Sequence, residues 1–209
     1  MQVLGYALFD TAIGCCGIAW SSRGVVRAQL PEASAAATRA RLAHLTHARE
    51  TEPPAAIAEA IEAITELLQG APNNLLGIEL DLSEVPDFAQ RVYAAARRIP
   101  VGKTITYGAL ARHIGNPGSA RALGQALGNN PFAPIVPCHR IVAAHGGTGG
   151  FSADGGVYTK LKMLAIERGD PEPTLTPQRR DGLSRKGATR NAQLQLELPP
   201  LRSSDERDR

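Results

Sequence analysis

The spacing of apolar and polar positions changes near residue 83. Before it, three short apolar runs separated by glycines and by a Ser-Ser-Arg-Gly turn predict an antiparallel meander; these runs cover residues 2–9, 13–20 and 24–30. An alanine-rich helix is expected over 34–49, and a second follows Pro53-Pro54, with one apolar face and Gly70 as its end. A further strand is expected over 76–82.

After Pro86 the pattern is helical. An apolar stripe at Phe88, Val92, Ala95 and Ile99 predicts a first helix. Two short helices, Thr106–Ile114 and Ser119–Leu127, are expected around the Gly115–Gly118 turn, with Ser119 as the cap of the second; Tyr158–Arg168 is a final helix. Two short helices across a tight turn form a helix-turn-helix, a pattern found in DNA-binding domains and also in structural bundles.

These patterns divide the chain into an α/β N-terminal domain over 1–83 and a mainly α-helical C-terminal domain over 84–170. From residue 171 onward Pro, Arg, Asp, Ser and Gln dominate, so we expect residues 171–209 to form a disordered tail. Within this tail, residues 193–198 form a small Leu-rich island.

The net charge and the number and spacing of the cysteines limit the kinds of function that the chain can have. The net charge of +3 is mild, so any contact with nucleic acid must come from a local basic patch. We find no apolar run long enough to span a membrane and no signal segment. Three cysteines make no disulfide framework, and neither they nor the histidines show zinc-ligand spacing. We expect a cytoplasmic monomer without metal or cofactor, with at most one of Cys15 and Cys16 in the core.

The segment that points most directly to catalytic chemistry is Pro137-Cys138-His139-Arg140. Cysteine is a strong nucleophile only as the thiolate, so a reactive cysteine needs a neighbour that takes or stabilises its proton. Pro134 and Pro137 favour a rigid loop that presents one side chain. A buried cysteine beside a surface histidine is the alternative, and these residue types alone leave both interpretations open.

Together with several other motifs, this segment resembles the O6-alkylguanine-DNA alkyltransferases, also called methylated-DNA–protein-cysteine methyltransferases. The matching motifs are Tyr-Gly-Ala-Leu-Ala at 107–111, Ser-Ala-Arg-Ala-Leu-Gly at 119–124, Asn130-Pro131, Pro-Cys-His-Arg at 137–140 and Gly150-Phe151-Ser152, with a weaker match at the N-terminus. The resemblance covers residues 1 to about 170. It implies a ribonuclease-H-like N-terminal domain, with a small mixed sheet and helices, and a winged-helix-like C-terminal domain that binds double-stranded DNA containing O6-alkylguanine.

The resemblance also implies roles for individual residues. Cys138 accepts the alkyl group irreversibly, in a single turnover, from guanine O6 and, as a second substrate, thymine O4. His139 is the water-linked proton acceptor and Glu167 the acid that orients and charges the imidazole. Tyr107 donates to the guanine ring nitrogen, and Asn130 ties the recognition helix to the cysteine loop.

On the DNA side, the resemblance assigns Arg121 to the base stack, where it replaces the flipped nucleotide. Ser119, Ala120 and Leu127 lie on the same expected helix and complete the DNA-binding set. The guanine pocket would be lined by Ser152 with the backbone around Val136, Ile141 and Phe151. Phe151 replaces the tyrosine of many relatives, and Ala153-Asp154-Gly155-Gly156 replaces a shorter turn; both bear on the size of the O6 substituent.

Three other classes of protein share part of this pattern. A non-catalytic alkylated-DNA-binding protein lacks the acceptor cysteine, which is present here. A cysteine hydrolase needs a thiolate and imidazole from separated positions. A helix-turn-helix regulator would bind one operator sequence instead of lesions. The Gln-Leu-x-Leu start of 193–198 resembles peptides that dock bacterial sliding clamps, and a weak clamp contact is the corresponding hypothesis.

Overall fold

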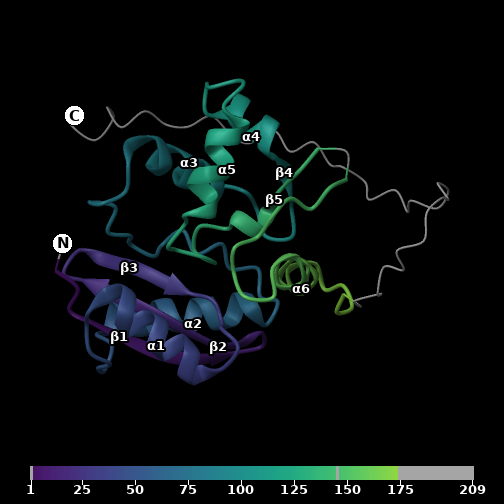
Figure 1. The fold of residues 1–209 in the computed structure, drawn as a ribbon. Helices are drawn as coiled ribbons and strands as arrows, with labels where there is room; N and C mark the ends of the chain where they lie inside the picture. Colours follow the sequence, from purple (N-terminus) through teal and green to yellow (C-terminus); the bar gives the residue numbers. More distant parts are fainter. Residues whose placement is uncertain (1, 145, 174–209) are drawn as a thin grey trace.

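A computed structural model describes residues 2–144 and 146–173 of the 209-residue chain. Its N-terminal part is an antiparallel sheet of order β1-β2-β3 with two helices (Figure 1). These elements are β1 (Gly5–Thr11), β2 (Gly14–Ser21), β3 (Gly24–Gln29), α1 (Ala35–Thr46) and α2 (Ala55–Leu68). The predicted meander and both predicted helices are confirmed, but the described sheet is antiparallel and not mixed, because tight turns join its consecutive strands. Gly14 and Gly24 begin β2 and β3 at the two turns with φ of +126° and +137°, a backbone region that favours glycine.

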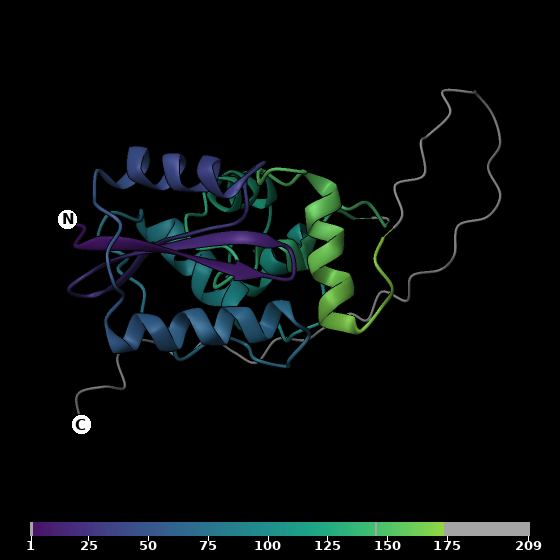
Figure 2. The ribbon, with the colours of Figure 1, turned by 90° about the horizontal axis from the view of Figure 1, so that it is seen from below.

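The two helices lie on opposite faces of this sheet (Figure 2). Tyr6 and its partner Ala19 pack against Leu42 of α1, whereas Ile18, on the other face, belongs to the cluster that includes Ile64 of α2. The alternation expected for a strand also separates the adjacent cysteines: Cys16 is buried and Cys15 is partly exposed.

The predicted strand over 76–82 is wrong. Only Leu80 makes an isolated bridge, to Val25 of β3, and the rest of the segment is irregular. The side chains of Asn73 and Asn74 accept hydrogen bonds from the backbone N–H groups of residues two positions ahead, which starts a turn instead of a strand. Arg97 donates to two carbonyls of the segment, those of Leu76 and Ile78, and to the carbonyl of Leu75 just before it. Side chains therefore satisfy groups that a ladder would otherwise pair.

The C-terminal part is mainly helical and carries a short parallel pair of strands. Its elements are α3 (Asp87–Arg97), β4 (Ile105–Thr106), α4 (Tyr107–His113), α5 (Ala120–Gly128), the 3₁₀ turn η1 (Cys138–Arg140), β5 (Ile141–Val142) and α6 (Val157–Arg168). The predicted helices are confirmed, and α4 and α5 form the helix-turn-helix. The chain therefore combines an α/β part with a helical part, as expected.

The caps of the two short helices differ. Thr106 Oγ1 accepts from Ala109 N at 3.2 Å and caps α4. Ser119 does not cap α5 as predicted: its hydroxyl instead donates to Asn116 O at 2.7 Å, within the turn. Ser119 thus stabilises the turn of the helix-turn-helix, and no side chain caps α5.

One hydrophobic core joins the two parts. Ile18 of the sheet, Val92 of α3, Leu123 of α5 and Ile135 before η1 are all fully buried in the same cluster. The outer edge of β3 adds a backbone contact, because Ala28 N donates to Pro131 O at 2.8 Å. The sheet therefore holds the segment that leads to Cys138. Among the described residues no helix has the length and apolar character needed to cross a membrane.

Candidate active site

Cys138 begins η1 at the end of a segment that hydrogen bonds hold in place. The carbonyl of Val136 accepts from Cys138 N and from Asn130 Nδ2, both at 2.8 Å. Asn130 Oδ1 accepts from Phe132 N at 2.9 Å. Asn130 follows α5 closely, so its amide ties the end of that helix to the cysteine segment. Cys138 thus begins a 3₁₀ turn directly after Pro137, one of the two prolines expected to make this segment rigid.

His139 and Glu167 form a buried pair behind Cys138. His139 Nε2 lies 2.7 Å from Glu167 Oε1, and the two side chains are 0% and 2% exposed. Glu167 also accepts from Gly102 N at 2.9 Å and from Arg140 Nη2 at 2.8 Å. Arg140 completes the cluster by donating to Ile99 O at 2.7 Å. Donors from η1 and from the loop at Gly102 are therefore directed at this carboxylate.

These contacts fix the charge of Glu167. Burial opposes its ionisation, but hydrogen bonds and charge from His139 and Arg140 outweigh burial and lower its pKa to about 2. Arg140 is the permanent counter-ion, since a guanidinium stays protonated in proteins. Arg140 is therefore a site residue that sequence reasoning left without a role, although it belongs to the Pro-Cys-His-Arg motif.

The imidazole of His139 is neutral in this arrangement. Burial lowers its pKa, and Arg140 and Lys160 act in the same direction, while Glu167 opposes them. A carboxylate can only accept, so Nε2 carries the proton that points to Glu167. Nδ1 is then an unprotonated acceptor, and it is buried without a hydrogen-bond partner among the described residues. Glu167 thus orients the imidazole, while burial, Arg140 and Lys160 hold the pKa of the ring below its ordinary value. The role of Glu167 in charging the imidazole stays a prediction.

Lys160 of α6 is the second site residue that the sequence did not reveal. It is fully buried, and its Nζ donates to Ile141 O at 2.6 Å. Burial lowers its pKa to about 8. Burial raises the pKa of the Cys138 thiol, whereas the Asn130 side chain and the Lys160 charge lower it. No spacing in the sequence links Lys160 to Cys138, because the contact depends on how α6 packs against η1.

Cys138 lies on the wall of two adjoining cavities. The first, of ≈ 440 Å³, has Tyr107 and Gly124 on the side of the helix-turn-helix and Phe151 and Ser152 opposite. Burial and the nearby Cys138 raise the pKa of Tyr107, so its hydroxyl is a donor at neutral pH. Gly149, at φ +71°, passes close to this ring: a Cβ there would lie 3.1 Å from Tyr107 Cε2. The glycine loop thus closes over the tyrosine.

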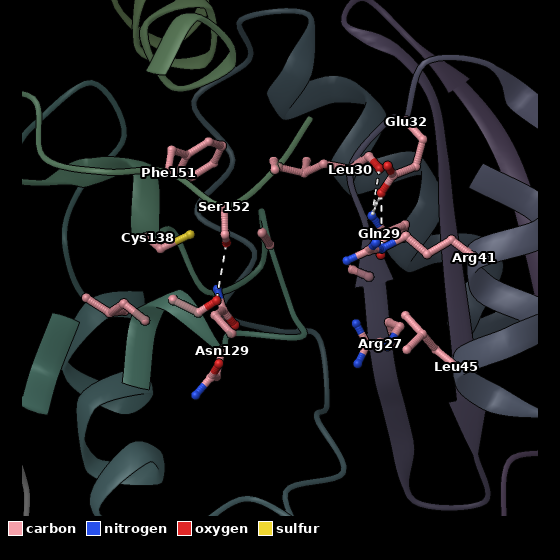
Figure 3. A pocket seen from close by; sticks show the side chains of 16 residues that line it. Arg27, Gln29, Leu30, Glu32, Arg41, Leu45, Asn129, Cys138, Phe151 and Ser152 are labelled. Atoms are coloured by element: carbon pink, nitrogen blue, oxygen red, sulfur yellow. Dashed lines mark hydrogen bonds and ion pairs between the residues drawn. The ribbon is translucent and has the colours of Figure 1, made fainter. Parts of the chain in front are cut away.

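The second cavity, of ≈ 280 Å³, lies between the sheet and the cysteine segment (Figure 3). Cys138, Phe151 and Ser152 belong to its wall as well, and they face side chains from β3 and α1. Ser152 Oγ donates to Gly128 O at 3.2 Å, which links the loop after Gly150 to the end of α5.

The structure separates the residues predicted for DNA and for the pocket. Arg121 is exposed on α5, and Ser119 and Ala120 are partly exposed at its start. Leu127 is 4% exposed and lies in the walls of both cavities, which is a pocket position and not a DNA-facing one. Val136 and Ile141 are fully buried in the core and do not line the cavities; their carbonyls accept from Asn130 and Lys160.

Comparison with known proteins places these features in one family. The model of the 6-O-methylguanine DNA methyltransferase DNA-binding domain matches residues 87–169. A methylated-DNA–protein-cysteine methyltransferase of Mycolicibacterium paratuberculosis is 43% identical over 126 residues, which are 60% of this chain and 74% of the relative. The structure of Mycobacterium tuberculosis OGT in complex with DNA aligns with a TM-score of 0.64 at 33% identity, over 80% of this chain and 96% of that one.

An archaeal structure agrees with these matches. O6-methylguanine-DNA methyltransferase from Pyrococcus kodakaraensis aligns with a TM-score of 0.62 at 26% identity, over 78% of this chain and 98% of that one. The fold and site therefore define a DNA-repair alkyltransferase. The chain belongs to the methylated-DNA–protein-cysteine methyltransferase family, whose members repair DNA by direct reversal, transferring an alkyl group from DNA to a cysteine.

Proposed function

We propose that Cys138 is the acceptor and that it takes the alkyl group from O6-alkylguanine, and from O4-alkylthymine as a second substrate, in flipped-out bases. The observation that carries this assignment is that Cys138 alone of the three cysteines lines the two cavities described above. Cys16 is buried on β2, and this burial raises the pKa of its thiol to about 12. Burial and the neighbouring Asp10 also raise the pKa of Cys15.

In the proposed reaction the damaged base occupies the cavity beside Tyr107. The Cys138 sulfur attacks the alkyl carbon in line, a C–S bond forms, and the bond from that carbon to O6 breaks. Its electron pair stays on guanine, which must gain a proton to leave as a neutral base. A hydrogen bond from the Tyr107 hydroxyl to a ring nitrogen stabilises the developing charge.

The thiol proton must leave Cys138 before or during this attack. We assign His139 Nδ1 as its acceptor, through one bridging water, because that nitrogen is the unpartnered base of the buried cluster. Glu167, which accepts from Nε2, then stabilises the imidazolium. This follows the logic of the hydrolase triad with a water added. Since no group is placed to cleave the resulting thioether, each molecule reacts once.

The C-terminal residues 84–170, as a winged-helix-like unit, supply the DNA-binding surface in this proposal. Arg121 is exposed on α5, the second helix of the helix-turn-helix, and we assign it as the planar cation that enters the base stack. The ribonuclease-H-like residues 1–83 support the cysteine segment through β3. Apart from DNA we expect a monomer in the cytoplasm. The Leu-rich island over 193–198, with its sliding-clamp hypothesis, and the predicted disordered tail over 171–209, apart from residues 171–173, lie outside the described residues.

Mass spectrometry tests the assignment directly. After incubation with duplex DNA containing O6-methylguanine, a gain of one methyl group should map to the peptide that carries Cys138. Cys138→Ser should bind the same DNA and gain no mass. Cys15→Ser, the matched control, should react as the unaltered protein does. A methyl group found on Cys15 or Cys16 would refute the proposal, and operator-specific binding without transfer would favour a helix-turn-helix regulator.

A further inference from the structure

The cavity between the two parts of the chain has walls of opposite character (Figure 3). On one side lie Cys138 and Phe151; on the other, β3 and α1 contribute Arg27 and Arg41. Arg27 points from β3 into the space between these walls. A pair of arginines is an unexpected lining for a site whose substrate, an alkylated base, carries no negative charge of its own.

The charges in this cavity do not balance. Arg41 Nε lies 3.1 Å from Glu32 Oε1, and the same oxygen accepts from Gln29 Nε2 at 2.8 Å, so the one carboxylate of the lining is already engaged. Arg27 is partly buried, and its guanidinium has no hydrogen bond or ion pair to any residue within 2–144 or 146–173. Burial and the neighbouring Arg41 lower the pKa of Arg27, so its surroundings disfavour the charged guanidinium.

The position of Cys138 connects this charge to the reaction. The base occupies the first cavity, and the carbon attached to O6 must meet the sulfur on the wall that both cavities share. Atoms of the substituent beyond that carbon can extend from this shared wall into the second cavity. The second cavity is the adjoining space, bounded by Phe151 on the near side and by Arg27 on the far side.

We propose that this second cavity receives O6 substituents larger than methyl, and that Arg27, assisted by Arg41, favours substituents ending in a carboxylate. The proposal rests on Cys138 as the acceptor. The step is the same transfer: the C–S bond forms at the carbon next to O6, the C–O6 bond breaks, and guanine leaves with its electron pair and a proton. The carboxylate keeps its charge and remains on Cys138 as part of the thioether, paired with Arg27.

Two free bases test the charge preference without DNA: O6-(4-carboxybenzyl)guanine and O6-(4-carbamoylbenzyl)guanine. They are nearly isosteric and differ by one negative charge. We expect the second-order rate constant for the carboxylate to fall about tenfold in Arg27→Met, the factor that about 1.4 kcal/mol produces. The rate for the carbamoyl compound should change less than twofold. Methionine keeps the apolar stem of Arg27 and removes only its charge.

Arg49→Ala is the charge-matched control, because Arg49 is exposed and lies outside the cavity lining. It should leave both rate constants unchanged. Equal losses on both compounds in Arg27→Met would overturn the proposal and give Arg27 a structural role, which thermal unfolding of the variant would register. No preference of the unaltered protein for the carboxylate would overturn it as well.

A duplex arm separates the substituent from the other source of negative charge, a DNA phosphate. With duplexes containing O6-methylguanine or O6-carboxymethylguanine, Arg27→Met should slow only the second. Slowing of both duplexes with no effect on the free bases would assign Arg27 to phosphate contact and overturn the proposal. Failure of the acceptor assignment looks different, because the alkyl group would then be missing from Cys138 with every substrate.

Discussion

Replacing Glu167 by glutamine is the sharpest test of the buried cluster. Glu167→Gln keeps the size of the side chain and removes its charge. The carboxylate accepts from His139, Arg140 and Gly102, using both oxygens. An amide has only one oxygen, so one of these donors must face an NH₂ group, and Arg140 loses its buried counter-ion.

The expected loss in the free energy of unfolding follows from the pKa of Glu167. Its folded value of about 2 lies below the ordinary value of 4.5, a difference worth about 3 kcal/mol to the folded state. Because the folded pKa is the lower one, this stabilisation is fully present above about pH 5 and is lost as the pH falls from about 4.5 towards 2. Breaking a buried ion pair by removing one partner costs a similar amount, about 3 to 5 kcal/mol.

We therefore expect Glu167→Gln to lower the free energy of unfolding by about 3 kcal/mol at pH 7, measured by urea denaturation. The difference from the unaltered protein should shrink as the pH is lowered to about 3. Single-turnover transfer should also slow, since the amide can donate to Nε2 and leave the proton on Nδ1. A variant of equal stability at pH 7, or a gap that does not narrow in acid, would refute this account of the cluster.

Three further outcomes are expected. Arg121→Ala should slow methyl transfer from duplex DNA far more than from free O6-benzylguanine, which needs no base flipping; equal losses would remove Arg121 from that role. Lys160→Met should shift the midpoint of the pH–rate profile for the free base upwards, because the Lys160 charge lowers the pKa of the Cys138 thiol; an unmoved midpoint would contradict it. Affinity for undamaged duplex should be weak and fall as salt rises, whereas salt-insensitive binding to one sequence would indicate a regulator.

Local patterns were sufficient to predict most of the elements. The strands at 13–20 and 24–30 and the helix after Pro54 depend on periodicity and on glycine or proline at their ends, which the sequence displays. The strand expected over 76–82 fails because Asn73, Asn74 and Arg97 satisfy its backbone groups. The two asparagines are visible in the sequence next to the segment, but Arg97 reaches it only through the packing of α3.

The residues of the site also fall into those that the sequence reveals and those that depend on tertiary packing. Cys138 and His139 stand out because they are adjacent in an unusual segment, and Glu167 was assigned through the family resemblance. Lys160 and Arg27 give no signal of that kind: each is an ordinary cation in the sequence. Lys160 lies buried near Cys138 because α6 packs against η1. Arg27 lies across the cavity from Cys138 because β3 packs against the segment that leads to η1.

The electrostatics of the cluster suit a cysteine that must react only once. Burial keeps the Cys138 thiol protonated at rest, which protects it from oxidation and from alkylating agents, because only the thiolate is strongly nucleophilic. In the proposed mechanism His139 removes the proton: its pKa is lowered, its Nδ1 has no hydrogen-bond partner among the described residues, and the Lys160 charge favours the thiolate. A base that enters the cavity displaces bulk water from it, keeps the bridging water between Cys138 and His139, and strengthens these interactions. The thiolate therefore forms where an alkyl carbon is already within reach of the sulfur.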